Sequence, residues 1–229
     1  MMRSLIGLTL LMLAGCGDPL VGLDYRGDPM ATVQGQVVLG GTATPAGGLY
    51  VVVGWHREAT PDTWTGEVVD VSGGFPASYL LDLLGPPPDS ALNVDPETQK
   101  KLGFAFLALM EDVNGNGELD VDQTGRGLPA GPDRFRGGAE TLLLAYAADP
   151  FPAGSRIAKE LGTELSVGYH LMKADEKFKC TWDEDHNDWL CPNARTELRK
   201  VPFSTPVDLK VIDKPSEWAP VHAPDWLFL

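Results

Sequence analysis

The stretch DVNGNGELDVD, residues 112–122, holds the side chains best suited to chemistry in this sequence. Asp112, Asn114, Asn116 and Asp120 offer side-chain oxygens at short intervals, and two glycines break the run. Carboxylate, amide and carbonyl oxygens on an adaptable loop suit Ca²⁺, whereas Mg²⁺ demands a stricter octahedral geometry. The spacing therefore predicts a loop that binds calcium as a structural ion.

Most of this loop follows the 12-residue frame of EF-type calcium sites. In that frame, oxygens come from positions 1, 3, 5, 7, 9 and 12, and a glycine stands at position 6. Counting from the first aspartate, Gly117 takes position 6 and the backbone carbonyl of Glu118 takes position 7, but Gln123 replaces the bidentate glutamate of position 12. Asp122 or Asp133 could supply the missing acid instead. Fewer charged ligands predict weak binding, in roughly the 10⁻⁴–10⁻³ M range of extracellular modules.

A metal-free turn between two strands is the alternative explanation of the same residues. Asn-Gly is the strongest short signal for a β-hairpin, and it occurs here twice, at 114–115 and at 116–117. A turn alone accounts for the glycines. It does not account for Asp112 and Asp120 on either side of them, so calcium is the first hypothesis.

The first sixteen residues have the order expected of a leader that ends in a lipidated cysteine. Arg3 gives a positive start, and the run LIGLTLLML, residues 5–13, is apolar but too short to span a bilayer. The segment LAGC, which ends at Cys16, resembles the lipobox of bacterial lipoproteins. That resemblance implies that Cys16 becomes the first mature residue and carries acyl chains. An ordinary signal peptide that happens to contain a cysteine is the alternative.

The lipobox resemblance also implies an address and a division of the chain. We expect a signal peptide over 1–15, a lipidated cysteine and tether over 16–31, and a single domain over 32–229. Gly17, rather than aspartate, follows the cysteine, and in proteins of this type that favours the outer membrane. We therefore expect an outer-membrane lipoprotein that faces the periplasm or the cell surface. The periplasmic side of the inner membrane is the alternative.

The two other cysteines, Cys180 and Cys191, have ten residues between them. A lone pair in an oxidising compartment indicates a disulfide. Such a loop would stabilise the fold by roughly 3 kcal/mol in the chain-entropy model. Zinc binding by this pair with His186 is the other possibility, but no fourth ligand stands at motif spacing.

The composition is acidic and rich in turn-forming residues. The chain has 18 Lys+Arg and 32 Asp+Glu, and its net charge of −14 argues against binding to nucleic acid. The 26 glycines and 19 prolines are spread along the chain, which favours short strands joined by turns over a helical bundle. About 200 mature residues suffice for one good core.

Apolar runs and alternating patterns predict an all-β fold of eight or nine strands. The expected strands are 32–39, 49–56, 64–71, 75–84, 103–111, 140–147, a segment within 161–172, a hairpin of 177–181 with 189–191, and 207–212. Short helices fit within 90–102 or 153–161. The run LYVVVGWH suits a strand buried on both faces. The C-terminal EWAPVHAPDWLFL is expected to dock on the core.

The strands GQVVL and LYVVVGW, the proline-rich end GPPP and the calcium-type loop together resemble transthyretin-like and carboxypeptidase-regulatory-like modules of small secreted or lipid-anchored bacterial proteins. The likeness covers roughly residues 32–147. It implies an antiparallel β-sandwich of Ig-like or transthyretin-like form, with long loops and little helix. The region 173–200, with its cysteine pair, departs from that pattern and is expected to be an insertion.

No motif in the sequence points to an enzyme. G-x-S-x-G, H-E-x-x-H and a phosphate-binding glycine loop are all absent, and the four histidines are scattered. We therefore predict a non-enzymatic structural or binding module with a protein or glycan partner in the envelope. The alternative is a carbohydrate-binding or hydrolytic protein that uses WDEDHNDW, residues 182–189, because tryptophan faces stack on ligands. That segment also suits a solvated hairpin end.

Overall fold

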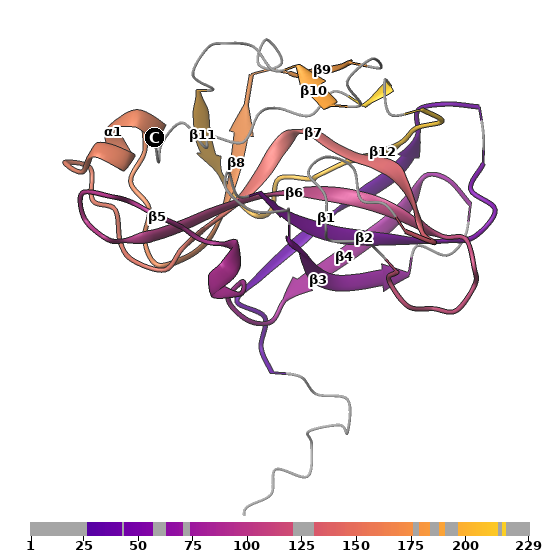
Figure 1. The fold of residues 1–229 in the computed structure, drawn as a ribbon, viewed down its shortest axis with the longest axis horizontal. Coiled ribbons are helices and arrows are strands. Elements are labelled where there is room, and N and C mark those ends of the chain that lie inside the picture. Colours follow the sequence, from indigo (N-terminus) through magenta and orange to yellow (C-terminus); the bar gives the residue numbers. More distant parts are fainter. Residues whose placement is uncertain are drawn as a thin grey trace, which may run out of the picture.

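Strands make up most of the described chain (Figure 1). The computed structural model describes residues 27–42, 44–56, 63–70, 74–120, 131–175, 179–183, 188–190, 197–214 and 217–218. The predicted all-β class is confirmed. The elements are β1 (Ala31–Leu39), β2 (Gly48–His56), β3 (Thr63–Asp70), β4 (Ala77–Leu83), the 3₁₀ turn η1 (Asp89–Ala91), β5 (Asn93–Val94), β6 (Lys101–Asp112), β7 (Arg134–Ala147), α1 (Arg156–Leu161), β8 (Gly168–Ala174), β9 (Thr181–Asp183), β10 (Asp188–Leu190), β11 (Leu198–Val201) and β12 (Leu209–Val211).

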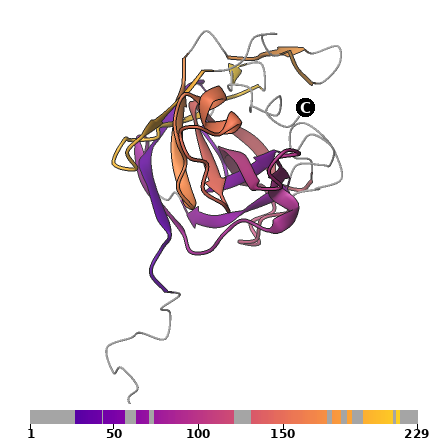
Figure 2. The same cartoon turned by 90° about the vertical axis from the view of Figure 1, so that its left-hand side faces the viewer.

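One strongly curled sheet contains all the described strands except the β9–β10 hairpin. Its order is β3-β2-β6-β7-β12-β1-β4, with β5 added to β6, and with β8 and β11 added beside the second half of β7. The curl brings β3 into contact with β4, and Figure 2 shows it from the side. All pairs are antiparallel except β1 with β12, so the expected antiparallel arrangement contains one parallel pair.

The main core fills the inside of the curl, and a second apolar cluster covers part of its outside. On β2, Val51 and Val53 join the main core, whereas Tyr50 and Val52 join the outer cluster. Both faces of this strand are therefore buried, as the apolar run predicted. Trp218 closes the outer cluster, because its ring packs on two phenylalanines of β6 and β7 and its Nε1 donates to a carbonyl of β7. The expected docking of the C-terminal segment is confirmed for this residue.

A third apolar cluster lies between α1 and the β7–β8–β11 part of the sheet. The helix begins after Ser155, whose hydroxyl accepts the Ala158 N–H, and ends at Gly162 in the left-handed conformation. The short helix expected within 153–161 is thus confirmed. In the described part of the chain, no helix has the length and apolar character needed to cross a membrane.

Strand β7 begins at Arg134, six residues before the predicted start at residue 140. The sequence RFRGG reads as a loop because glycine normally weakens a strand. Here a Cβ at Gly137 would lie 2.2 Å from the Lys210 carbonyl oxygen, and one at Gly138 would lie 2.2 Å from that of Leu107. The two glycines therefore allow close approach of β12 and β6, which extends β7 to the edge where β6 ends.

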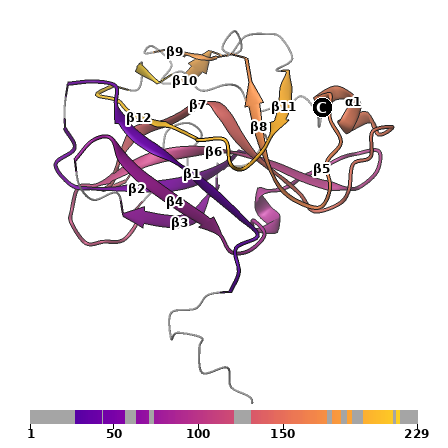
Figure 3. The same cartoon turned by 180° about the vertical axis from the view of Figure 1, so that it is seen from behind.

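The directions of the strands place the calcium-type loop at the end of the sheet opposite the start of β1. Strand β1 runs parallel to β12, β12 runs antiparallel to β7, and β7 runs antiparallel to β6. Strands β1 and β6 therefore point the same way, and Asp112 at the end of β6 lies far from Ala31 at the start of β1. Figure 3 shows β1 and β4 side by side, with the start of β1 beside the end of β4.

Candidate metal centre

Asp112, the last residue of β6, is 5% exposed and anchors the loop that follows it. Its Oδ2 accepts the N–H of Gly117 at 2.9 Å and the hydroxyl of Tyr50 at 2.9 Å, and its Oδ1 accepts the N–H of Gly115 at 2.6 Å. The Gly117 N–H, aided by the Tyr50 hydroxyl and the Gly115 N–H, holds the pKa of Asp112 below its ordinary value. The carboxylate is therefore kept ionised and fixed in direction.

The predicted ligands at positions 3, 5 and 9 of the loop contact one another. The side-chain amides of Asn114 and Asn116 both donate to Asp120 Oδ2, at 2.8 and 2.7 Å. Their Oδ1 atoms accept the N–H groups of Asn116 and Glu118, at 3.0 and 2.8 Å. Since an amide oxygen has two lone pairs, each retains one for a cation. The loop thus gathers carboxylate, amide and carbonyl oxygens, which are ligands of the calcium type.

Glycines and one leucine give the loop its path. Gly115 and Gly117 have φ values of 70° and 75°, in the left-handed region that side-chain-bearing residues rarely adopt. Leu119 packs against the outer apolar cluster. The loop is therefore held against the sheet at its middle as well as at Asp112. Asp122 and Gln123 lie outside the described residues.

Asp133 lies immediately before β7 and contacts the end of the loop. It is 3% exposed, its Oδ2 accepts the Asp120 N–H at 2.7 Å, and its own N–H donates to the Asp120 carbonyl at 3.3 Å. Its Oδ1 is buried and has no hydrogen-bond partner. Where the structure describes the chain, no group of three or more His, Cys, Asp or Glu side chains is placed to hold a metal ion. A cation here would therefore need the amide and carbonyl oxygens as well.

A buried ionic network that the sequence analysis did not predict lies beside the loop. Arg136 Nη1 is 3.7 Å from Glu111 Oε2, and its Nη2 is 3.9 Å from Asp213 Oδ1. Glu111 Oε1 also accepts the N–H groups of Ala46 and Gly47, at 2.7 and 3.2 Å. These residues come from four separate segments, so sequence spacing carried no signal of the network. The ion-pair partners of Arg136 are therefore Glu111 and Asp213 rather than the acids of the loop. Asp112, Asp120 and Asp133 form no ion pair with a described Lys or Arg.

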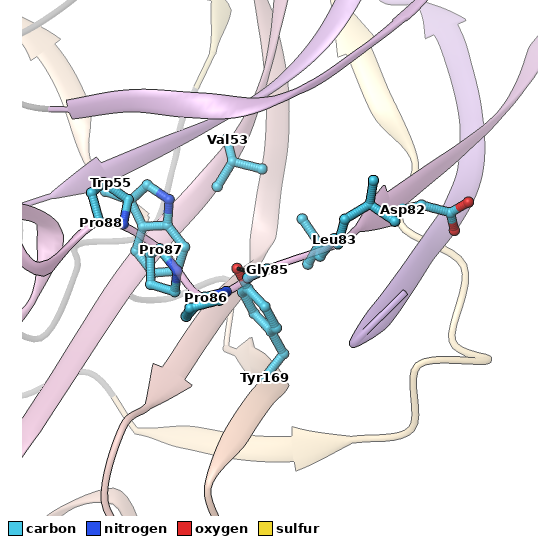
Figure 4. A pocket seen from close by; sticks show the side chains of 10 residues that line it. Val53, Trp55, Asp82, Leu83, Gly85, Pro86, Pro87, Pro88 and Tyr169 are labelled. Carbon is cyan, nitrogen blue, oxygen red and sulfur yellow. Dashed lines mark hydrogen bonds between the residues drawn. The ribbon is translucent and has the colours of Figure 1, made fainter. Parts of the chain in front are cut away.

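A small cavity of about 170 Å³ lies at the opposite end of the sheet (Figure 4). Its lining includes Val53, Trp55, Asp82, residues 83–88 and Tyr169. The Tyr169 hydroxyl donates to the Gly85 carbonyl, and Asp82 accepts the Thr32 hydroxyl, so these polar groups are already engaged. The volume is also below the range of about 300–1,000 Å³ typical of small-molecule sites. The Tyr169 hydroxyl and the Asp82 carboxylate are thus less available to bind a ligand than the oxygens of the loop.

The histidines and the acidic hairpin supply no second centre among the described residues. His170 is buried, its Nε2 lies 2.7 Å from the Ser166 carbonyl oxygen, and burial lowers its pKa, as suits a structural histidine. A hairpin is present as β9 and β10, but it pairs residues 181–183 with 188–190 rather than the expected 177–181 with 189–191, and Trp182 lies opposite Trp189 in the register. The acidic tip at 184–187, His186, His222 and the side chain of His56 lie outside the described residues.

The loop after β6 is the best supported of these candidate sites, because it combines ionised carboxylates, amide oxygens and a buried oxygen without a partner. Comparisons with protein-family models, curated proteins and solved structures find no match to this chain.

Proposed function

We propose that this chain is a lipid-anchored protein of the bacterial envelope, a non-enzymatic structural or binding module whose loop after β6 binds calcium. The observation that carries the calcium proposal is the arrangement of Asp112 and Asp120. Both carboxylates are held on one loop with two asparagine amides, and neither is paired with a described Lys or Arg. Oxygen ligands around uncompensated negative charge favour a hard cation.

Calcium in this loop would act on the fold rather than on a substrate. The ion would join the end of β6 to the turn that carries Leu119 onto the outer apolar cluster. A ligand that binds only the folded state raises the free energy of unfolding by RT ln(1 + c/Kd), where c is the concentration of free ligand. Titration of the purified full-length protein in detergent with CaCl₂ tests the proposal. We expect saturable binding that is weaker for MgCl₂, and no detectable binding of calcium would contradict it.

The direction of the strands indicates how a molecule anchored through its N-terminus would present the loop. The proposed anchor precedes β1, and the loop lies at the end of the sheet opposite the start of β1. The anchored molecule would therefore present the loop away from its own membrane. Calcium sites with few charged ligands work at the 10⁻⁴–10⁻³ M concentrations found outside the cytosol, in order of magnitude.

Replacing the lipobox cysteine tests the anchor. We expect Cys16→Ser to remove the acyl chains, because serine lacks the thiol that carries one of them, and to move the protein from the membrane to the aqueous fraction. Multiple acyl chains anchor a protein stably, so the change should be nearly complete. Intact mass spectrometry and cell fractionation provide the measurement. Full-length protein that retains its leader and an unmodified Cys16 thiol would contradict the anchor.

The β9–β10 register supports the proposed disulfide. Thr181 pairs with Leu190, so the described part of the hairpin begins directly after Cys180 and ends directly before Cys191 in the sequence. Cross-strand Cβ atoms lie about 4.5–5.5 Å apart, close to the span of a disulfide. Cys180 is buried, and Cys191 lies outside the described residues, so their bond stays a prediction.

Breaking this bond should cost the protein stability. We expect Cys191→Ser to lower the free energy of unfolding by roughly 3 kcal/mol, since the unfolded chain regains the entropy of an open loop. Urea unfolding under oxidising conditions measures the loss, and the same loss is expected when the unmutated protein is reduced. If reduction leaves the unmutated protein's stability unchanged, the disulfide is wrong.

A further inference from the structure

We infer that Asp133 is the acidic ligand that closes the proposed calcium site, in place of the glutamate that a contiguous 12-residue loop carries at its last position. The inference rests on the proposed calcium function. It makes the site a two-element one, built from the end of β6 with its loop and from the start of β7. Asp133 would then supply the carboxylate that position 12 lacks, because Gln123 stands there in place of glutamate.

The register of β6 and β7 sets Asp133 opposite Asp112. Met110 pairs with Phe135, and Glu111 pairs with Arg134, so the next pair along the two strands is Asp112 with Asp133. Met110 and Phe135 both belong to the outer apolar cluster. Because alternate residues of a strand share a face, the two carboxylates lie on that same outer face. Like charges directly opposite one another destabilise a sheet unless a cation separates them.

The carboxylate of Asp133 has one oxygen engaged and one free. Oδ2 accepts the N–H of Asp120, and the backbone of Asp133 donates back to the Asp120 carbonyl. These two bonds hold Asp133 against position 9 of the loop. Oδ1 is buried with no hydrogen-bond partner, although a buried charge is normally paired, hydrogen-bonded or bound to a metal. A cation beside Oδ1 would satisfy it.

With Asp133 the proposed ligand set becomes complete. In the proposed calcium-bound state, the carboxylates of Asp112, Asp120 and Asp133 would join the amide oxygens of the two loop asparagines and one backbone carbonyl, whereas without the ion the three carboxylates do not form a metal-holding group. Six oxygen ligands or more are what calcium requires. The third charge also replaces the one lost at position 12, so Asp122 is not needed as a ligand.

The test compares two matched variants of the full-length protein in detergent. Asp133→Asn keeps the shape of the side chain and an acceptor for the Asp120 N–H, and it removes only the charge. Asp122→Asn makes the same change at the other acidic candidate. By calcium titration we expect Asp133→Asn to raise Kd by about tenfold or more, because ligand charge sets affinity. We expect Asp122→Asn to stay within about twofold of the unmutated protein.

Melting in chelator separates a ligand from a structural aspartate. Without calcium, Asp133→Asn should melt at the same temperature as the unmutated protein or higher, because it relieves repulsion from Asp112. With saturating calcium the order should reverse. Unchanged calcium affinity in Asp133→Asn, or a lower melting temperature in chelator, would overturn the inference while calcium binding itself stands. Absence of calcium binding by the unmutated protein would overturn both.

Discussion

Asp112→Ala is expected to abolish the effect of calcium on thermal unfolding. In the unmutated protein, calcium at about 100 times its Kd should stabilise the fold by about 2.7 kcal/mol. For a protein of this size that corresponds to a rise in Tm of about 5–10 °C over the value in chelator. Asp112 is the first proposed ligand of the loop, and its carboxylate also accepts the Gly115 and Gly117 N–H groups. Without it the site loses both a charge and its shape.

Differential scanning calorimetry in CaCl₂ and in chelator measures this effect. The variant should melt at one temperature in both conditions, below the unmutated protein even in chelator, because two loop N–H groups and the Tyr50 hydroxyl lose their acceptor. Asp89→Ala is the control, since Asp89 is exposed and lies in η1, away from the loop. That variant should keep the full calcium shift. Identical melting of the unmutated protein in both conditions would contradict the calcium site.

Arg136→Ala is expected to lower the free energy of unfolding by about 3–5 kcal/mol, the usual cost of removing one partner from a buried ion pair. The Arg136 and Glu111 side chains are each 6% exposed, so the variant leaves a buried carboxylate without its counter-charge. Glu111 remains tied to the backbone of residues 46–47 and does not reach solvent easily. Urea unfolding of the two proteins measures the difference.

A double variant shows whether the lost charge is the cause. Arg136→Met with Glu111→Gln removes both charges, keeps apolar volume on β7 and retains an acceptor for the Ala46 and Gly47 N–H groups. Replacing a buried ion pair by neutral groups is often close to neutral, so we expect the double variant to recover most of the loss. Arg134→Ala, at an exposed position of the same strand, should change stability by less than about 0.5 kcal/mol. No recovery in the double variant would show that packing, rather than charge, explains the loss.

The sequence alone determined the features that depend on neighbouring residues. The apolar run of β2 predicted a strand buried on both faces, and that burial is observed. The spacing of Asp112, Asn114, Asn116 and Asp120 predicted one oxygen-rich loop. The two asparagine side chains do contact Asp120 there, because a tight turn brings them together, whereas the Asp112 carboxylate accepts backbone N–H groups of the loop. A short helix was also expected within 153–161, and α1 lies there, with Ser155 and Gly162 at its ends.

Only the tertiary structure decided which distant segments became neighbours. Strand β11 was not predicted, because its four residues LRKV do not alternate between apolar and charged side chains. Its position is set by pairing with β8. The early start of β7 was missed because its glycines serve contacts with β6 and β12 that no local pattern reports. The parallel pairing of β1 with β12 likewise joins opposite ends of the chain.

The candidate site divides in the same way. The ligand positions 1, 3, 5, 7 and 9 lie close together in the sequence, so composition and spacing sufficed to propose them. The choice between Asp122 and Asp133 was open in the sequence, because it depends on the register of β6 against β7. Hydrogen bonds between two strands select that register, and its continuation by one residue is the basis for proposing Asp133 as the ligand opposite Asp112. Sequence spacing measures distance along the chain, whereas a ligand shell depends on distance through space.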